Sequence, residues 1–387
     1  MADTYNYGGE ETRQVDTGNI KCEKCGGEMV FDPATQKLVC DHCGNTVDIE
    51  KNFNVKENDI EDAFDKAEKW DKNENTAYRC ENCGAVIYLN KGEVATRCPF
   101  CGTPNVVETE EMEGIKPQVV IPFLLGIDKA EMFSRKWAKS RLFAPKKFKK
   151  NLQSENMRGV YEPAFTFDSR TFSRYVGRVG DRHTRTVGSG KNQHVETYIV
   201  YRNVSGSYNQ FFDDVFVACG EKFGQNNLNK VGPFRTAASC VYEKKYLTGF
   251  MANRYEKDLK TSWQDAKVII DSKIRQNIIS SCHCDTVDYL NVSTHHENVT
   301  YKYMLLPVYI CNYNYKGKAY NIYINGSTGK VSGKTPVSAL RVGIAVLIGL
   351  GIAALIAVLY HLFAGGNYTH SDYSIDYLIK SLPEFLK

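Results

Sequence analysis

The sequence of 387 residues lacks a strong charge of either sign. Its 49 Lys and Arg residues nearly balance its 45 Asp and Glu residues, which gives a formal net charge of +4. A balance this mild does not by itself indicate a nucleic-acid-binding protein. Apolar residues make up 42% and charged residues 24% of the chain, which excludes a wholly disordered or a collagen-like protein.

The sequence also lacks the common motifs of catalysis and secretion. No G-x-G-x-x-G or Walker sequence opens a predicted helix, and no helicase motif is present. Residues 1–19 are polar, without the apolar core of a secretory signal, and we expect them to be disordered. These absences favour a protein that is not an enzyme. An enzyme whose site includes His283 or Cys284 is an alternative.

Eight of the 13 cysteines form two sets with the same spacing, C-x2-C-x14-C-x2-C. The sets are Cys22, Cys25, Cys40 and Cys43, then Cys80, Cys83, Cys98 and Cys101. Two C-x2-C turns joined by about 15–20 residues are typical of a zinc ribbon. We therefore expect two Zn²⁺ sites, one in a ribbon at 20–49 and one in a ribbon at 78–102. Four Cys ligands leave no open position on the metal, so both sites are expected to be structural.

A disulfide framework is the alternative for these cysteines. The repeated spacing and the polar N-terminus argue against it, and thiols kept reduced for zinc imply the cytosolic side of a membrane. Residues 20–49 carry a net charge of −2 and residues 78–102 a net charge of +1. Each Zn²⁺ with four thiolates adds −2, so the ribbons are expected to bind nucleic acid poorly.

The tripeptide Cys282-His283-Cys284 could be a third metal site or a nucleophile beside a base. On a strand, neighbouring side chains point to opposite faces, so His283 would face neither cysteine. We expect these thiols to be inert.

One long apolar run stands near the C-terminus. Val342–Leu359 contains no charged residue, and the span 342–363 would be roughly 33 Å long as a helix. Lys330, Lys334 and Arg341 precede the run, and no acidic residue occurs between Glu297 and Asp372. The positive-inside rule then predicts a single-pass protein of the cell membrane, with a cytoplasmic N-terminal bulk and a tail outside at 364–387.

The remaining segments predict an acidic helical linker at 50–77 and a β-rich α+β domain at 115–335. The linker helix is expected at about 59–72, with Asn58 and Glu61 as a capping box. In the domain, Asp128 and Glu131 are expected to cap a helix at 128–142. The other elements expected there are a helix at 258–280, strands at 165–167, 194–201 and 211–218, a loop or hairpin tip at 177–192, and a hairpin of 303–315 with 319–324.

The only strongly basic stretch runs from residue 129 to residue 150, with nine basic residues and one acidic residue. The basic residues are Lys129, Arg135, Lys136, Lys139, Arg141, Lys146, Lys147, Lys149 and Lys150. They could form a patch for anionic lipid headgroups, nucleic acid or an acidic partner. The alternative, which we favour, is a solvated helix face and turn with aromatic residues in the core.

Several segments together resemble a family of bacterial membrane proteins, the TFIIB-type zinc ribbon-containing proteins. The segments are KCEKCGGEMVFDP (21–33), YRCENCGAVI (78–87), ATRCPFCG (95–102), IPF (121–123), FAPKKF (143–148), GVYEPAFTFD (159–168) and PVYICNYNYKGKAYNIYINGSTGKVSGKTP (307–336). The resemblance does not extend to residues 200–300 and implies no catalytic residue. It implies a membrane-anchored adaptor, with envelope-stress proteins of the SPFH-domain or phage-shock type as partners.

The function we expect is therefore a membrane-anchored cytoplasmic zinc-ribbon adaptor that recruits a protein partner. The alternative is a membrane-tethered nucleic-acid-binding protein of transcription or replication, which would use the basic residues at 129–150.

Overall fold

The structure is a computed structural model that describes residues 20–62, 75–81, 85–90, 98–100, 106–109, 115, 117–220, 222–253 and 255–364. The predictions for residues 1–19 and for the tail after residue 364 lie outside these ranges. The chain forms two compact units. Unit 1 contains Met1–Ser140 and Lys146–Thr335, and unit 2 contains Arg141–Pro145 and Pro336–Lys387. The expected mixed α+β class is confirmed, and both ribbon segments belong to the same unit as the α+β domain.

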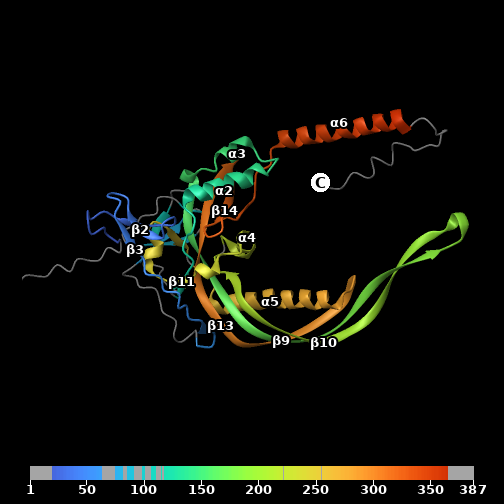
Figure 1. Ribbon diagram of the computed structural model, residues 1–387, viewed down its shortest axis with the longest axis horizontal. Helices are drawn as coiled ribbons and strands as arrows, with labels where there is room; N and C mark the ends of the chain where they lie inside the picture. Colours follow the sequence, from blue (N-terminus) through green and yellow to red (C-terminus); the bar gives the residue numbers. More distant parts are fainter. Residues whose placement is uncertain are drawn as a thin grey trace, which may run out of the picture. The chain divides into compact units, whose positions relative to one another are not determined.

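Three very long strands build the sheet of unit 1 (Figure 1). They are β9 (Met157–Val187), β10 (His194–Ala218) and β13 (Thr286–Tyr315). The central strand β9 pairs antiparallel with both others. At 31, 25 and 30 residues, these strands far exceed the usual length of about 5–6 residues. The short strands expected at 165–167, 194–201 and 211–218 are parts of β9 and β10.

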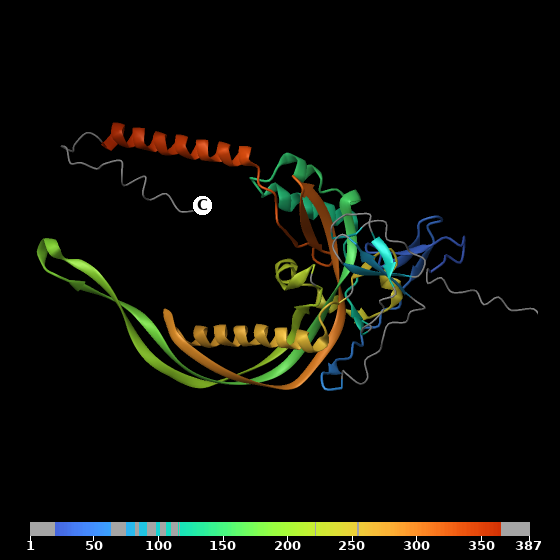
Figure 2. The same ribbon diagram turned by 180° about the vertical axis from the view of Figure 1, so that it is seen from behind.

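Two β-bulges bend this sheet at the same level. The register shifts between Phe212 and Val215 on β10, and between Glu297 and Thr300 on β13. Both bulges face β9 near Asp168. A bulge places an extra residue on one strand and bends it. The three strands therefore curve together, and helix α5 (Leu259–Cys282) lies on the inner side of the curve (Figure 2).

Helix α5 confirms the helix expected at 258–280. Asp258 caps its N-terminus, because its carboxylate accepts a hydrogen bond of 2.7 Å from the Thr261 N–H. The apolar face of α5 is buried against the sheet, with Ala266, Ile270, Ile274 and Ile278 fully inaccessible. The helix ends at His283, which has a left-handed backbone with φ of 46°. Cys282, His283 and Cys284 thus lie at a helix end and not on a strand.

The loop or hairpin tip expected at 177–192 is a hairpin tip only at its C-terminal end, and the loop is wrong for residues 177–187. Strand β9 continues to Val187, and the connection to β10 contains only the short 3-10 helix η2 (Gly190–Asn192) and its flanks. The glycines of this segment allow strands to approach closely. A Cβ on Gly180 would lie 2.5 Å from Ile199 Cγ2, and one on Gly177 would lie 2.7 Å from the Tyr289 carbonyl oxygen.

Shorter elements complete unit 1. The expected hairpin is confirmed, because β14 (Lys318–Asn325) pairs with the end of β13 through a turn at Lys316 and Gly317, both with positive φ. The remaining elements are β4 (Asn58–Asp59), β8 (Val119–Val120), β11 (Cys240–Val241), β12 (Met251–Asn253), β15 (Val331–Gly333), α2 (Ile127–Lys139), α3 (Lys146–Lys150), α4 (Gly224–Val231), η1 (Ser154–Asn156), η3 (Thr236–Ala238) and η4 (Lys244–Leu247).

Two local details differ from expectation. Where the linker helix was expected to begin, Asn58–Asp59 form strand β4 against Thr300 and Tyr301 of β13. The rest of that helix, 63–72, lies outside the described residues. Helix α2 starts after Gly126 without a side-chain cap. Glu131 does not cap it, because its carboxylate accepts from the Ser154 N–H at 2.7 Å.

Unit 2 contains helix α6 (Ala339–Ala364), an apolar helix whose residues are exposed from Gly343 to Phe363. Its 26 residues are enough to cross the hydrocarbon core of a membrane, about 30 Å thick. The apolar C-terminal helix expected at 342–363 is therefore present and begins three residues earlier.

Candidate metal centre

The first cysteine set lies on a small sheet of three antiparallel strands. These are β1 (Met29–Asp32), β2 (Lys37–Cys40) and β3 (Thr46–Asp48), with β2 in the middle. The turn between β1 and β2 is held by Asp32. Its carboxylate accepts hydrogen bonds from the backbone N–H groups of Ala34 and Thr35 at 3.0 and 3.1 Å, and this lowers the Asp32 pKa, although its partial burial raises it.

Two similar turns present the four thiols. In the first, the Gly26 N–H donates to the Cys22 carbonyl at 2.8 Å, and in the second the Gly44 N–H donates to the Cys40 carbonyl at 2.8 Å. Gly26 and Gly44 have φ of 70° and 71°, a backbone conformation that side chains other than glycine rarely adopt. The glycine after each of these two C-x2-C pairs therefore closes its turn.

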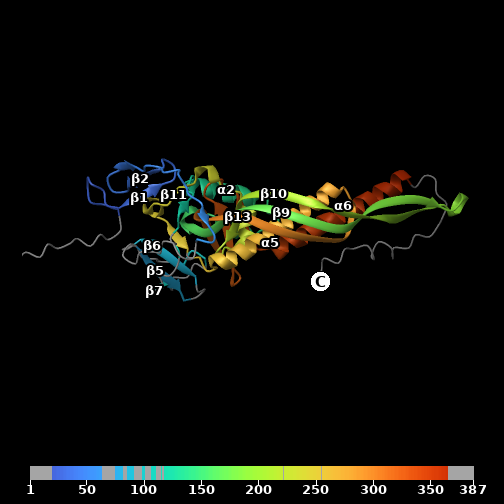
Figure 3. The ribbon, with the colours of Figure 1, turned by 90° about the horizontal axis from the view of Figure 1, so that it is seen from below.

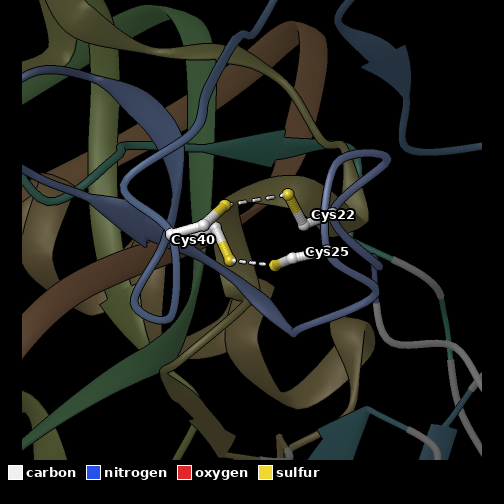
Figure 4. A group of neighbouring side chains, drawn as sticks. Cys22, Cys25 and Cys40 are labelled. Atoms are coloured by element: carbon white, nitrogen blue, oxygen red, sulfur yellow. Dashed lines mark hydrogen bonds between the residues drawn. The ribbon is translucent and has the colours of Figure 1, made fainter.

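The four sulfur atoms converge. The Sγ atoms of Cys22 and Cys43 are 3.5 Å apart, as are those of Cys25 and Cys40. All four lie within 4.8 Å of one another. A tetrahedral zinc ion with Zn–S bonds of about 2.3 Å separates its sulfurs by about 3.8 Å, so the spacing fits a four-cysteine metal site. Figure 4 shows the sulfurs of Cys22, Cys25 and Cys40 turned toward one centre.

The electrostatics of the cluster lower the pKa of Cys22 and raise that of Cys25. Burial raises the pKa of Cys22, but the N–H groups of Lys24 and Cys25 and the neighbouring thiols outweigh it, and the pKa falls to about 6. The Gly27 N–H lowers the pKa of Cys25, but Cys43 and Cys40 outweigh it and raise it to about 12. Four thiolates this close therefore need a cation among them.

The cluster sits at the surface of unit 1. Cys22 and Cys40 are buried, whereas Cys25 and Cys43 are exposed. His42 is exposed and is not one of the grouped ligands. Gly27 lies close beneath the cluster, because a Cβ there would be 3.3 Å from Cys40 Sγ and 3.4 Å from Cys25 Sγ. The site is therefore tightly enclosed on one side and open to solvent on the other.

The first ribbon is attached to the α+β domain by specific contacts. The Phe31 N–H donates to the Thr248 carbonyl at 3.1 Å, and the Phe31 ring meets the ring of Tyr246 edge-on at 5.5 Å. The Gln36 side-chain amide donates to the Phe123 carbonyl at 2.7 Å. The ribbon is therefore attached to the domain through Phe31 on β1 and through Gln36 in the turn between β1 and β2.

Three strands of the main sheet lie in or beside the second ribbon segment, which was expected at 78–102. They are β5 (Asn75–Cys80), which begins before it, β6 (Val86–Asn90), which lies within it, and β7 (Val106–Thr109), which follows it; β6 pairs with β12. Figure 3 shows these strands apart from β1 and β2. Cys80 and Cys98 are buried, and the Cys80 N–H donates to the Ala85 carbonyl at 2.9 Å, as the Cys22 N–H donates to Gly27 at 2.7 Å. Cys83 and Cys101 lie outside the described residues, so the second metal site stays a prediction.

The basic residues at 129–150 lie on α2, on α3 and on the loop between them. Eight are exposed and Lys149 is half-buried. Arg135 pairs with Glu131 at 2.7 Å and donates to the Leu152 carbonyl at 3.2 Å, so it contributes to the packing of α2. Arg141 belongs to unit 2 and the other eight to unit 1.

An acidic cluster near the bulges was not predicted; in it Asp168 is buried, Asp214 is half-buried and Asp213 is exposed. Carboxylate oxygens of Asp168, Asp213 and Asp214 lie within 4.8 Å of one another. The Lys302 ammonium group contacts Asp214 at 2.8 Å and Glu57 at 3.0 Å, and so supplies a cation within the protein. Burial and the nearby Glu57 raise the pKa of Asp168 to about 7, although the Asp214 N–H opposes this. The sequence gives no signal for the cluster, because only the bulges bring these residues together.

Comparison with known proteins adds one relative. The chain is 29% identical over 356 residues to "Uncharacterized protein YdjG" of Bacillus subtilis (strain 168), which covers 90% of this chain and 99% of the relative. No protein-family profile and no solved structure matches the chain. The similarity therefore covers most of the chain, and the relative's name does not state a function.

Proposed function

We propose that the protein is a membrane-anchored cytoplasmic adaptor whose zinc ribbons recruit a protein partner to the membrane. The closed four-cysteine cluster of the first ribbon is the observation that supports this most strongly. Four thiolates complete the coordination of Zn²⁺ and leave no position for a substrate or an activated water. The metal then stabilises a surface and does not perform chemistry.

The charge of the first ribbon indicates the kind of partner. Residues 20–49 carry a net charge of −2, and a zinc ion with four thiolates brings it to −4. The exposed rim beside the metal includes Glu23 and Asp41. An acidic surface repels nucleic-acid phosphates and attracts a basic protein surface. Because the ribbon is hydrogen-bonded to Thr248 and Phe123, it would present this surface in a fixed orientation.

The second ribbon is proposed to hold a second structural zinc ion. Cys80 and Cys98 are buried, and the chain supplies Cys83 and Cys101 at the matching positions. Since β6 of this ribbon pairs with β12 of the domain, metal binding there would stabilise the sheet itself. The two ions would thus differ in role. The first would stabilise an exposed surface of the first ribbon, and the second would stabilise the main sheet.

Helix α6 is proposed to span the cell membrane once, with unit 1 in the cytoplasm. Lys330, Lys334 and Arg341 lie on its N-terminal side, and acidic residues are absent from the sequence there after Glu297. A cytoplasmic location also keeps the ribbon thiols reduced. The tail at 364–387 would then lie outside the cell.

The proposal is tested by purifying the full-length protein from its native membrane in mild detergent and identifying what accompanies it. We expect a defined protein partner, and envelope-stress proteins of the SPFH-domain or phage-shock type are the first candidates because of the sequence resemblance. Recovery of the partner should fall for the double variant Glu23→Lys with Asp41→Lys, which leaves the cysteines intact. The control variant Cys282→Ser should recover the partner as the wild type does. Absence of any defined partner would contradict the adaptor role.

Binding of nucleic acid is the second candidate function, favoured by the exposed basic residues of α2 and α3. It predicts nucleic acid in the same preparation, released steeply as salt rises. Charge reversal of Lys146, Lys147, Lys149 and Lys150 should then abolish the binding.

A further inference from the structure

The loop Arg141–Pro145, between α2 and α3, belongs structurally to the membrane helix. It forms unit 2 together with the chain from Pro336 onward. The Ser338 N–H donates to the Phe143 carbonyl at 2.9 Å, and Arg341 Nη1 donates to the Leu142 carbonyl at 2.9 Å. These two donors lie at the very start of α6. The loop is therefore held beside the point at which the chain would enter the membrane.

The loop exposes apolar side chains at this point. Leu142 is 74% exposed and Phe143 is 44% exposed. In the adjoining segment Val337 and Leu340 are 62% and 75% exposed. Four large apolar side chains held within a few residues of a membrane helix form a surface that water solvates poorly and that a lipid interface accepts.

Basic side chains flank the loop on both sides. Lys139 is the last residue of α2, and Arg141 lies two residues after it. Lys146 and Lys147 are the first two residues of α3. All four are exposed. Each lies within two residues of the loop or in it, so the chain cannot place its Cα more than about 7 Å from a loop end. No acidic residue occurs from residue 132 to residue 154. The charge beside the apolar side chains is therefore of one sign.

We propose that this loop and its flanks form a lipid-binding surface for the anionic headgroups of the cytoplasmic leaflet. Lys139, Arg141, Lys146 and Lys147 would contact the phosphates, while Leu142 and Phe143 would enter the interface between headgroups and acyl chains. The inference rests on the proposed membrane span of α6. Each basic residue near an anionic surface contributes about a fivefold factor to docking.

Two other basic residues, Arg135 and Lys129, are not part of the proposed lipid-binding surface. Arg135 is bound to Glu131 and to the Leu152 carbonyl. Lys129 lies ten residues from Lys139 along α2, or about 15 Å. The C-terminal end of α2 and the start of α3 thus contain the exposed basic residues that lie nearest the loop in the chain. Nucleic acid would use the same phosphate contacts, but it offers no apolar surface for Leu142.

The experiment uses the full-length protein in nanodiscs, either of phosphatidylcholine alone or of phosphatidylcholine mixed with phosphatidylglycerol. Hydrogen–deuterium exchange of residues 139–147 is followed by mass spectrometry. We expect exchange to be slower in the anionic discs, with the difference removed by Lys139→Glu, Arg141→Glu, Lys146→Glu and Lys147→Glu together. The matched control reverses two exposed lysines of α5, Lys260→Glu and Lys273→Glu, and should keep the difference. Unchanged protection of α5 amides shows that each variant is folded.

Two further measurements separate the possible failures. If alkaline carbonate removes the wild-type protein from native membranes, the membrane span itself is wrong. If the protein stays in the membrane but residues 139–147 exchange equally in both discs, the lipid-binding surface is wrong and the anchor stands. Protection of these residues by added RNA in phosphatidylcholine discs, without any effect of phosphatidylglycerol, would also overturn the proposal and favour nucleic acid.

Discussion

Glu162 gives the sharpest test of the electrostatics inside the fold. Its side chain is fully buried in the sheet next to β12, with Oε2 accepting from the Asn253 amide at 3.2 Å. Its Oε1 has no hydrogen-bond partner among the described residues. Burial raises the Glu162 pKa to about 8, aided by the charge of Glu256 and opposed by Asn253. The carboxyl group is therefore expected to be protonated at neutral pH.

The sign of the pH effect follows from proton binding. The ordinary pKa of a glutamate, 4.5, applies to the unfolded chain, whereas about 8 applies to the folded protein. Between these values the folded state holds a proton that the unfolded state has released, so folding stability falls as pH rises. The slope is about 1.4 kcal/mol per pH unit, which sets an upper limit of about 5 kcal/mol over the whole window.

The substitution Glu162→Gln removes this titration and keeps the shape of the protonated side chain. We expect the variant to gain stability relative to the wild type as pH rises from 5 to 8, measured by denaturant unfolding of the full-length protein in detergent. Other titrating groups, such as Asp168, are common to both proteins and cancel in the difference. Exposed Glu155→Gln is the control and should leave the pH profile unchanged. Identical profiles for the wild type and Glu162→Gln would refute the reasoning.

Three further predictions follow from individual contacts. Lys302→Met should lower the free energy of unfolding by about 3–5 kcal/mol at pH 7, because it leaves the carboxylates around Lys302 without their cation. Denaturant unfolding should show a smaller decrease in stability at pH 5, where Asp168, with its pKa of about 7, is protonated. Ile274→Ala on the buried face of α5 should cost about 2–5 kcal/mol, whereas Val268→Ala, at a site 65% exposed, should cost much less in the same assay. Gly27→Ala should weaken retention of zinc against a chelator, because its Cβ would lie 3.3 Å from Cys40 Sγ; equal retention would contradict the proposed enclosure of the site.

The features predicted correctly from the sequence are those that local chemistry determines. The C-x2-C spacing identifies the two turns that bring the four thiols together, in which Gly26 and Gly44 have positive φ. The helical period of Ile270, Ile274 and Ile278 identifies the buried face of α5. The Lys316–Gly317 turn also depends on neighbouring residues alone.

The features that the sequence did not reveal depend on pairing between distant segments. The glycines between 177 and 192 are typical of a loop, but Gly177 and Gly180 allow strands to approach within one sheet. The length of β9 and the bulges at Asp214 and Asn298 result from pairing with β10 and β13. The cluster around Lys302 follows from those bulges. The local sequence pattern does not predict these features, because they depend on the register of the paired strands, and the partners of β9 on β13 are more than 100 residues away.

Zinc content per chain tests the central claim most directly. The full-length protein is purified in detergent without added metal, and bound zinc is measured by elemental analysis against protein concentration. The proposal predicts two zinc ions per chain for the wild type and for the control Cys282→Ser. It predicts one zinc ion per chain for each double variant, Cys22→Ser with Cys40→Ser and Cys80→Ser with Cys98→Ser. A folded wild-type protein without zinc, or a zinc content that the first pair of substitutions leaves unchanged, would contradict the account.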